Sequence, residues 1–257
     1  MKTLAILQAR ASSTRLANKV LLPILKQPML ILQIMRITRC RNIDKLLVAT
    51  SNDASDDAIA KLCAQNNIAC FRGSLNDVLD RFYNAAEKYQ PQHVVRLTAD
   101  CPLIDHAVID AVIEHHLNGN FDYTSNTITR SFPDGLDVEI MKISVLSDAW
   151  HEAKLPSHRE HVTPFVYQHP DRYQIGQFTN NKNLANLRWT VDEPEDFNLI
   201  VKIYENLYPK KPDFNMNDII DLLTQHPELK KINDNITCNE GMLKSLKADR
   251  QYLIEEQ

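Results

Sequence analysis

Short apolar runs alternate with helix signals along the first 116 residues of the chain. The apolar runs at residues 3–8, 45–50, 68–71 and 93–97 predict buried strands, because strands covered on both faces are continuously hydrophobic. Capping residues and apolar spacing between these runs predict helices at residues 28–39, 53–66, 76–89 and 105–116. The alternation of strand and helix predicts an α/β fold with a mainly parallel sheet and right-handed crossovers.

The pattern becomes less regular after residue 120. We expect strands at residues 121–125, 136–141, 173–178 and 187–191, and helices at residues 143–153, 159–168 and 194–207. From residue 213 onward the sequence predicts short helices with polar connections, and no repeat or glycine-rich linker divides the chain. We therefore expect one domain over residues 1–257, with an inserted subdomain at residues 120–185 and a C-terminal helical extension at residues 213–257.

Composition narrows the class of protein. A hydrophobic fraction of 44% and a charged fraction of 24% are typical of an ordinary globular protein. The net charge of −4 argues against a nucleic-acid partner, and no apolar run is long enough for a membrane helix or a signal peptide. The five cysteines are odd in number and include no Cys-x-x-Cys pair, which indicates reduced thiols. We therefore expect a cytoplasmic protein with no membrane partner.

A basic loop follows the first predicted strand. It carries Arg10, Arg15 and Lys19 together with the hydroxyls of Ser12, Ser13 and Thr14. Open α/β sheets bind ligands at the carboxyl ends of their strands, where this loop would lie. Arginine forks, a lysine point charge and small hydroxyl donors suit a polyphosphate. The alternative is a basic surface loop of no special function.

Two acids end other predicted strands. Asp100 follows the strand at residues 93–97, and Asp192 follows the strand at residues 187–191. If these strands are neighbours, both carboxylates would meet the ligand of the basic loop and could hold Mg²⁺. The alternative for Asp100 is the cap of a turn. Glu195 and Asp196 lie in the first turn of a predicted helix and are interpreted as structural.

The segment His158-Arg-Glu-His161 is a possible zinc motif. However, the metalloprotease pattern requires the order His-Glu-x-x-His, and no third ligand follows at a useful spacing. A cluster at a helix end that contacts an anionic acceptor is the preferred interpretation.

Taken together, the motifs resemble the cytidylyltransferase family. More narrowly, the chain resembles the branch of spore-coat polysaccharide biosynthesis protein F, which is similar to the CMP-sialic acid and CMP-Kdo synthetases. The resemblance covers nearly the whole chain and rests on Gln8-Ala-Arg10-x-x-Ser13-x-Arg15-Leu-x-x-Lys19, Arg72-Gly-Ser74-x-x-Asp77-Val-Leu-x-Arg81, Thr98-Ala-Asp100-Cys-Pro-Leu, Asp134-Gly-Leu-Asp137-Val-Glu139, His158-Arg-Glu160-His161-Val-Thr-Pro, Thr190-Val-Asp192-Glu-Pro-Glu-Asp196 and Asn239-Glu240-Gly241 with Lys244-Ser245-Leu246.

The resemblance implies a fold and an activity. The fold would be the three-layer α/β/α sandwich of nucleotide-diphosphosugar transferases. The activity would be transfer of CMP from CTP to a sugar acid, nonulosonic or Kdo-like, with release of pyrophosphate for surface polysaccharide or glycan biosynthesis. The implied cofactor is Mg²⁺ (or Mn²⁺), the implied partners are CTP and the sugar acid, and the implied assembly is a homodimer that forms through the acceptor-binding subdomain at residues 120–185.

The resemblance also implies roles for individual residues. The catalytic group would be Arg10, Arg15, Lys19, Asp100 and Asp192, with Asp100 and Asp192 as metal ligands. The nucleotide would contact Ala9, Arg10, Ser12, Ser13, Arg15, Lys19, Arg72, Ser74, Asp77, Arg81 and Thr98. The acceptor would contact Asn126, Asp134, Asp137, Glu139, His158, Glu160 and His161. The base that takes the proton of the attacking hydroxyl would be Asp192 or a nearby acid.

The basic loop departs from the pattern of the branch at two points. Ser12 stands where relatives often have glycine, and Ala17-Asn18 stands where they have Pro-Gly. Serine can still donate to phosphate, and asparagine tolerates the left-handed backbone region. Two other functions remain open: a glycosyltransferase, which would usually carry an Asp-x-Asp motif that Asp100-Cys-Pro lacks, and a non-catalytic nucleotide-binding protein.

Overall fold

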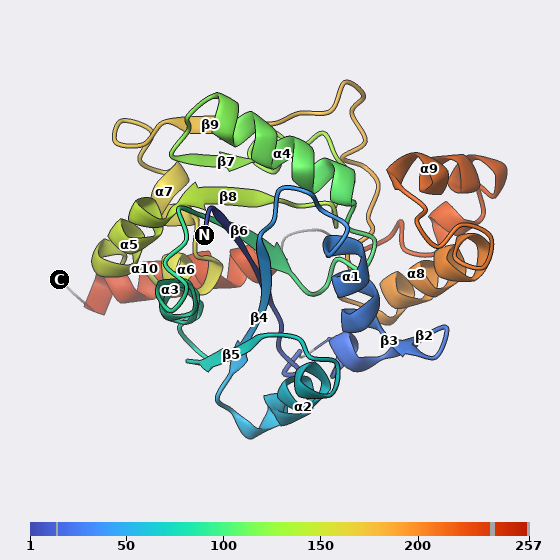
Figure 1. Ribbon diagram of the computed structural model, residues 1–257, viewed down its shortest axis with the longest axis horizontal. Coiled ribbons are helices and arrows are strands. Elements are labelled where there is room, and N and C mark those ends of the chain that lie inside the picture. Colours follow the sequence, from blue (N-terminus) through green and yellow to red (C-terminus); the bar gives the residue numbers. More distant parts are fainter. Residues whose placement is uncertain (14, 237–239, 256–257) are drawn as a thin grey trace.

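A seven-stranded sheet runs through the centre of the molecule (Figure 1). The computed structural model describes residues 1–13, 15–236 and 240–255, and in the last range it describes side chains from residue 245 onward. Thr14 and the motif residue Asn239 lie outside the described residues, as do the side chains of Glu240 and Lys244. The strand order is β5-β4-β1-β6-β8-β7-β9. In that order the strands are Cys70–Gly73, Lys45–Ser51, Thr3–Gln8, His93–Thr98, Glu139–Lys142, Tyr123–Ser125 and Ile175–Gln177.

The sheet is mixed but mainly parallel, as predicted. β5, β4, β1 and β6 are parallel to one another, β8 is antiparallel to both β6 and β7, and β9 is parallel to β7. β1 lies between β4 and β6, and its last residue, Gln8, is in register with Ala49 and Thr98. The loops that follow β1 and β6 therefore begin side by side at one edge of the sheet.

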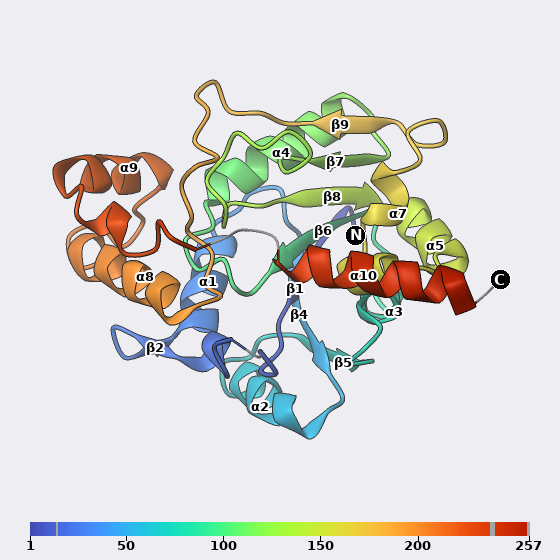
Figure 2. The same ribbon diagram turned by 180° about the vertical axis from the view of Figure 1, so that it is seen from behind.

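Successive side chains of β1 alternate between two hydrophobic clusters, one on each face of the sheet. Leu4 and Ile6 belong to one hydrophobic cluster, whereas Ala5 and Leu7 belong to the other. Successive side chains of a strand point to opposite faces, so a continuously apolar strand must be covered on both sides. Helices cover both faces, and this confirms the three-layer α/β/α sandwich (Figures 1 and 2).

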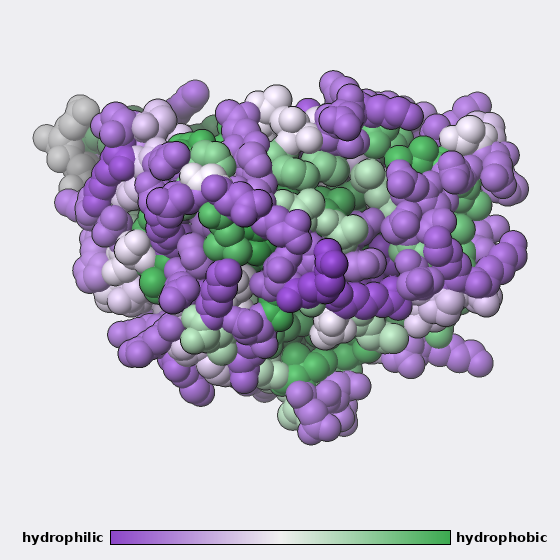
Figure 3. All heavy atoms as spheres, turned by 45° about the horizontal axis from the view of Figure 1, so that its top comes forward, coloured by the Kyte–Doolittle hydropathy of each residue, from purple (hydrophilic) through white to green (hydrophobic). Residues whose placement is uncertain are grey.

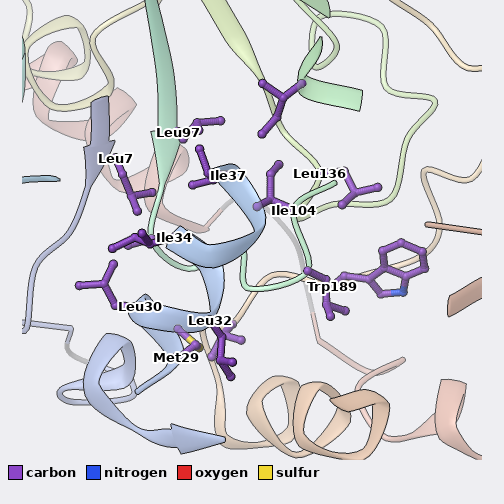
Figure 4. Packing of buried hydrophobic residues seen from close by; sticks show 14 of the residues in the cluster. Leu7, Met29, Leu30, Leu32, Ile34, Ile37, Leu97, Ile104, Leu136 and Trp189 are labelled. Atoms are coloured by element: carbon purple, nitrogen blue, oxygen red, sulfur yellow. The ribbon is translucent and has the colours of Figure 1, made fainter. Parts of the chain in front are cut away.

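The layer next to Leu7 contains five helices, which are α1 (Met29–Ile37), α2 (Asp57–Gln65), α4 (His106–Asn118), α8 (Pro194–Leu207) and α9 (Met216–Gln225). In Figure 4, Leu30, Ile34 and Ile37 of α1 point toward Leu7 of β1 and Leu97 of β6. The other layer contains α3 (Val78–Glu87), α5 (Ile143–Glu152), α6 (Pro156–His161), α7 (Pro164–Tyr167) and α10 (Glu240–Glu255). Figure 2 shows α10 running across this layer.

Short elements complete the described fold. A small hairpin of β2 (Pro23–Ile24) and β3 (Gln27–Pro28) precedes α1. Single 3₁₀ turns occur at η1 (Lys19–Leu21), η2 (Ala54–Asp56) and η3 (Leu229–Lys231). The Asp105 carboxylate accepts a hydrogen bond from the Ala107 N–H at 2.8 Å, which confirms Asp105 as the cap of α4.

The single helix predicted at residues 159–168 is wrong. The segment starts earlier, at Pro156, and forms two short helices, α6 and α7, that are separated around Val162. Val162 has a φ of +71°, outside the helical region. Pro164 explains the break, because proline lacks an N–H group and its ring would clash with the carbonyl of Glu160 in a continuous helix.

Two other sequence predictions need correction. The segment at residues 187–191 is not a strand of the sheet, and it pairs only at an isolated bridge between Asp134 and Arg188. The tail also contains a helix of 16 residues, α10, rather than short helices alone. Its sequence has a weak apolar periodicity, and its burial depends on packing against α6.

Polar and charged residues cover most of the face in Figure 3, with hydrophobic residues in patches between them. None of the helices in the described ranges has the length and apolar character that a membrane crossing requires.

Candidate active site

The loop after β1 turns back on itself through backbone hydrogen bonds. The N–H groups of Ser13 and Asn18 both donate to the Ala11 carbonyl, at 2.8 Å and 3.0 Å. The Ala11 N–H donates to the buried carboxylate of Asp56 at 2.7 Å, which anchors the loop to the end of β4. Asn18 has a φ of +56°, so the residue that replaces a glycine of the relatives adopts the left-handed conformation that asparagine tolerates. This loop geometry directs Lys19 into the interior.

Lys19 lies between the two carboxylates that end separate strand-like segments. Its Nζ donates to Asp192 Oδ1 at 2.9 Å, to Asp100 Oδ2 at 3.3 Å and to the Val191 carbonyl at 2.7 Å. Burial disfavours the charged ammonium, but the two carboxylates outweigh it and raise the pKa of Lys19. Burial likewise opposes ionisation of Asp100, yet Lys19 and neighbouring hydrogen bonds lower its pKa to about 2. The carboxylates of Asp100 and Asp192 are therefore both directed at one point, Lys19 Nζ.

Asp192 reaches this point because its segment is tied to the loop after β6. The Val191 N–H donates to the Asp100 carbonyl at 2.8 Å, and the Thr190 hydroxyl donates to the same carbonyl at 3.3 Å. Gly135 allows the backbone at Trp189 and Thr190 to pass close to its own backbone. It has a φ of +110°, and a Cβ at this position would lie 2.6 Å from the Thr190 backbone nitrogen. A side chain at residue 135 would therefore collide with the backbone that positions Asp192.

Arginines surround the carboxylates. Arg15 contacts Asp192 Oδ1 at 3.0 Å, and Arg188 contacts Asp192 Oδ2 at 3.2 Å. Arg188 also forms a buried double hydrogen bond with Asp196, at 2.9 Å to each oxygen, and contacts Asp134 at 3.2 Å. Asp196 is fully buried and accepts the N–H groups of Asp192 and Glu193, the two residues before α8, so it supports the site structurally.

These groups line a cavity of about 850 Å³. Predicted site residues that line it are Arg10, Ser12, Ser13, Arg15, Lys19, Thr98, Asp100, Asp134, Asp137, Glu160, His161 and Asp192. A second cavity of about 550 Å³ adjoins it. The two cavities share five lining residues, which are Arg96, Thr98, Arg130, Asp137 and His161.

Other predicted nucleotide-binding residues do not line the larger cavity. Ala9 is buried in the core, and Arg72 donates to the carbonyls of Ser51 and Asp53. Arg81 is fully buried and donates to the Ser74 carbonyl at 2.7 Å. The other two residues of this group are Ser74 and Asp77. The Ser74 hydroxyl accepts the Asp77 N–H at 3.0 Å, and Asp77 caps α3 and pairs with Arg159, a residue that does line the cavity.

Three predicted acceptor residues also lie away from the larger cavity. Asn126 is buried and binds the backbone at Leu136 and Val138. His158 is hydrogen-bonded to Gln168 at 3.0 Å. The third, Glu139, lines only the second cavity, where it pairs with Arg96 and accepts hydroxyls of Tyr123 and Thr163 at 2.6 Å each.

The two histidines of the possible zinc motif have separate partners. His161 is hydrogen-bonded to Ser245 of α10 at 2.8 Å, whereas His158 binds Gln168. In residues 1–13, 15–236 and 240–255, no group of three or more His, Cys, Asp or Glu side chains is placed to hold a metal.

Several cavity residues were missed by reasoning from the sequence, namely Gln8, Asn76, Arg96, Arg130, Arg159, Arg188, Thr190 and Ser245. Arg96 had a usable signal, because a charged residue within an apolar strand must find a partner or a ligand. Arg130 and Arg159 lie in irregular or short segments where no periodicity shows which way a side chain points. Ser245 belongs to a motif of the resemblance, but its position far from the loop along the chain gave no indication that it reaches the cavity.

Comparison with known proteins identifies relatives along most of the chain. The sequence profile of the family described as Cytidylyltransferase matches residues 4–235. An uncharacterized protein of Methanocaldococcus jannaschii is 37% identical over 238 residues, which are 92% of this chain and 96% of that protein. The spore coat polysaccharide biosynthesis protein SpsF of Bacillus subtilis is 32% identical over 233 residues, which are 88% of this chain and 95% of that protein.

A structural relative extends the comparison. The structure of a cytidylyltransferase from Leptospira borgpetersenii superposes with a TM-score of 0.85 and 29% identity, and covers 93% of this chain and 100% of that one. A 3-deoxy-manno-octulosonate cytidylyltransferase of Chlorobium phaeobacteroides is 28% identical over 119 residues, which are 46% of this chain and 47% of that protein. The chain therefore belongs to the cytidylyltransferase family, in the branch of spore coat polysaccharide biosynthesis proteins, and is a nucleotidyltransferase.

Proposed function

We propose that the protein transfers CMP from CTP to a hydroxyl of a sugar acid, nonulosonic or Kdo-like, and releases pyrophosphate. The observation that carries the proposal is the convergence of the loop cation Lys19 with Asp100 and Asp192 in one cavity. Nucleotidyl transfer requires a triphosphate to be held in place and its charge to be neutralised, and little covalent chemistry from the protein. The relationship to a spore coat polysaccharide biosynthesis protein supports a sugar as the acceptor.

The loop after β1 would bind the triphosphate. Arg10, Ser12, Ser13, Arg15 and Lys19 all line the larger cavity, and the guanidinium groups can each donate two hydrogen bonds to phosphate oxygens. The cations would stabilise the negative charge that develops on pyrophosphate as it leaves. The ion pairs that these side chains form with protein carboxylates would then be exchanged for contacts with phosphate.

Asp100 and Asp192 fit a Mg²⁺ or Mn²⁺ ion as ligands. Both offer carboxylate oxygens directed at one cationic group, Lys19 Nζ, at 3.3 Å and 2.9 Å. Magnesium is usually held by one or two carboxylates and completes its shell with phosphate oxygens and water. When bound, the ion would polarise the α-phosphate and lower the pKa of the attacking hydroxyl.

The second cavity is the proposed site of the acceptor. It is lined by segments within residues 120–185, and the guanidinium groups of Arg96 and Arg130 reach it. Paired N–H donors of arginine match the two oxygens of a carboxylate, which suits a sugar acid. Glu139 forms an ion pair with Arg96 within this cavity, so that the arginine is held before the acceptor arrives.

Thermal unfolding with nucleotides tests the proposal. CTP with Mg²⁺, at about 100 times its Kd, should stabilise the fold by about 2.7 kcal/mol, which is a shift of about 5 °C or more in Tm. UTP, ATP, GTP and UDP-sugars serve as comparisons, each with and without Mg²⁺. A panel of sugar acids should then be screened for pyrophosphate release from CTP.

Each outcome separates the candidate functions. Stabilisation by CTP that depends on Mg²⁺, followed by pyrophosphate release with a sugar acid, supports the proposal. Stabilisation by a UDP-sugar while CTP has no effect would contradict it and favour a glycosyltransferase. Binding of Mg²⁺–CTP without turnover of any sugar acid would leave the nucleotide site standing and refute the acceptor class.

A further inference from the structure

Asp137 lies where the two cavities meet, and its side chain lines both of them. If the larger cavity holds CTP and the smaller one holds the acceptor, as proposed above, the attacking hydroxyl must cross this junction. Four other described residues line both cavities: Arg96, Thr98, Arg130 and His161. The only carboxylate among the five is that of Asp137.

The acids at the centre of the nucleotide cavity are poorly suited to accept a proton. Both oxygens of Asp192 are paired, Oδ1 with Lys19 and Arg15 and Oδ2 with Arg188. Asp100 is held ionised by Lys19, and its pKa of about 2 makes it a weak base. Both acids are also the proposed metal ligands, and a bound metal ion would occupy the same oxygens.

Other acids near the junction are also occupied. Both oxygens of Glu139 are paired, one with Arg96 and the other with the hydroxyls of Tyr123 and Thr163. Asp134 lines the larger cavity alone and pairs with two arginines, Arg188 at 3.2 Å and Arg130 at 3.5 Å.

The oxygens of Asp137 are also paired, but with fewer donors from the described residues: two N–H groups of Arg130, against three donors each for Glu139 and Asp192. Arg130 donates to both oxygens of Asp137, at 3.4 Å and 3.2 Å, and a carboxylate has about four lone-pair sites, so further sites remain for a hydroxyl. Its side chain is 29% exposed into the cavities. Asp134 and Glu139 add negative charge beside it, and the Cys101 thiol lies nearby.

Burial, with a smaller contribution from Asp134 and Glu139, raises the pKa of Asp137 to about 6 despite the opposing charge of Arg130. The carboxylate is therefore a stronger base than an ordinary aspartate and is still mostly ionised at neutral pH. A base works best when its pKa lies near the working pH.

We propose that Asp137 is the general base of the reaction. The Asp137 carboxylate takes the proton of the acceptor hydroxyl while that oxygen forms a bond to the α-phosphorus. The bond from the α-phosphorus to the oxygen that bridges to the β-phosphate breaks, and its electron pair leaves with pyrophosphate. Asp137 then returns the proton to solvent. This role rests on the proposed function, because it assigns the second cavity to the acceptor.

His161 is the competing base. It also lines both cavities, but it is hydrogen-bonded to Ser245 at 2.8 Å. Burial, together with the positive charge of Arg96, lowers the pKa of His161 to about 4, so the imidazole is neutral at pH 7 but weakly basic.

The test compares Asp137→Asn and Asp137→Glu with the wild-type protein and with His161→Gln. Pyrophosphate release is measured from about pH 4.5 to about pH 8.5, and Mg²⁺–CTP binding is measured by thermal shift. Asp221→Asn is the matched control, because Asp221 is an exposed aspartate on α9, away from both cavities.

Asp137→Asn should lower kcat about 100-fold or more, while the KM for CTP and the thermal shift with Mg²⁺–CTP stay near the wild-type values. In the wild-type protein, kcat/KM for the acceptor should fall as pH drops below about 6, because Asp137 becomes protonated. This fall at low pH, the acid limb of the pH profile, should disappear in Asp137→Asn. It should return in Asp137→Glu at a shifted pH. A purely structural role would not remove the limb.

Three results would overturn the assignment. An Asp137→Asn variant with wild-type kcat and an intact acid limb would refute the base while the proposed function stands. Loss of the limb in His161→Gln but not in Asp137→Asn would transfer the role to His161. A wild-type protein that releases no pyrophosphate with any sugar acid would refute the proposed function and the base with it.

Discussion

At the scale of single residues, Lys19 holds two like charges together. Asp100 and Asp192 would repel each other at the sheet edge if the ammonium did not lie between them. Removing one member of a buried charge cluster is costly because the remaining charges keep their desolvation penalty. The stability of this edge of the sheet and its ability to bind CTP are therefore expected to depend on the same side chain.

We predict that Lys19→Met lowers the free energy of unfolding by about 1–3 kcal/mol, since it retains the length of the side chain but removes the charge. The pKa of Asp100 should rise toward its ordinary value of 3.8, because its main attractive partner is gone. Millimolar Mg²⁺ should restore part of the lost stability. Urea denaturation with and without Mg²⁺ measures both effects.

Lys202→Met provides the control for this prediction. Lys202 also pairs with a carboxylate, that of Glu205 at 2.9 Å, but both side chains are nearly half exposed. Exposed pairs contribute less than about 1 kcal/mol, so this variant should unfold close to the wild type. Equal losses in the two variants would contradict the role given to Lys19.

The sequence allowed part of the candidate site to be predicted. Arg10, Lys19 and Asp100 follow parallel neighbouring strands, and the rule that strand ends meet at one edge brings them together without further information. Arg130 and Arg159 could not be foreseen, because their segments lack periodicity and their direction depends on contacts with Asp137 and Asp77. The rule of strand ends therefore found groups next to strands, whereas the predicted residues Asp134, Asp137, Glu160 and His161, which come from a loop and the short helix α6, depended on the resemblance to the family.

At the scale of elements, α10 supports α6 from outside the region matched by the family profile, which ends at residue 235. Asp249 of α10 accepts a hydrogen bond from the Ser157 N–H at 2.8 Å, in the first turn of α6. The first turn of a helix has N–H groups without partners inside the helix, and a carboxylate there satisfies one of them. α6 in turn carries Glu160 and His161 into the cavity.

We predict that Asp249→Ala destabilises the protein by about 1–2 kcal/mol, because a buried N–H loses its acceptor. The KM for CTP should also rise, since Glu160 pairs with Arg10 of the loop after β1. Chemical denaturation and steady-state kinetics check the two effects.

Asp249→Asn is the matched variant, because an amide oxygen can still accept the Ser157 N–H. It should retain most of the stability and most of the affinity for CTP. If asparagine proved as harmful as alanine, charge rather than the hydrogen bond would explain the effect of Asp249.

The secondary-structure elements were predictable where the apolar pattern is strong and less so where tertiary contacts decide their form. The strands and helices before residue 118 have strong apolar patterns and clear caps such as Asp105, and they occur where expected. The later strands, β7, β8 and β9, have only three or four residues each, and their form depends on tertiary contacts. The segment at residues 187–191 illustrates this, because a bridge to Asp134 and hydrogen bonds to the Asp100 carbonyl hold it rather than a sheet partner along its length.

At the scale of the whole molecule, the sign of the charge differs between the chain and its cavity. The chain has a net charge of −4. The larger cavity is lined by seven cationic side chains and five carboxylates in the described part of the chain: Arg10, Arg15, Lys19, Arg96, Arg130, Arg159 and Arg188 against Asp100, Asp134, Asp137, Glu160 and Asp192. The excess of cationic side chains in the cavity would attract a polyanion although the chain as a whole is negative.

We predict that the association rate of CTP falls about tenfold between about 50 mM and about 500 mM salt, because screening shortens the reach of the field. The kcat at saturating substrate should change much less. Uncharged cytidine is the control ligand, and its binding should be insensitive to salt. An equal response for CTP and cytidine in stopped-flow measurements would rule out steering by charge.

The position of α10 also bears on how the protein is made in the cell. The wall of the nucleotide cavity includes Arg10 near one end of the chain and Ser245 and Ala248 near the other. Contacts between residues so far apart in sequence form late and slow the folding of a domain. A ribosome-bound chain that has not yet exposed residue 248 has an incomplete cavity, so full stabilisation by CTP is available only to the finished fold. Chaperones and proteases that act during synthesis would therefore meet the chain before CTP can fully stabilise it.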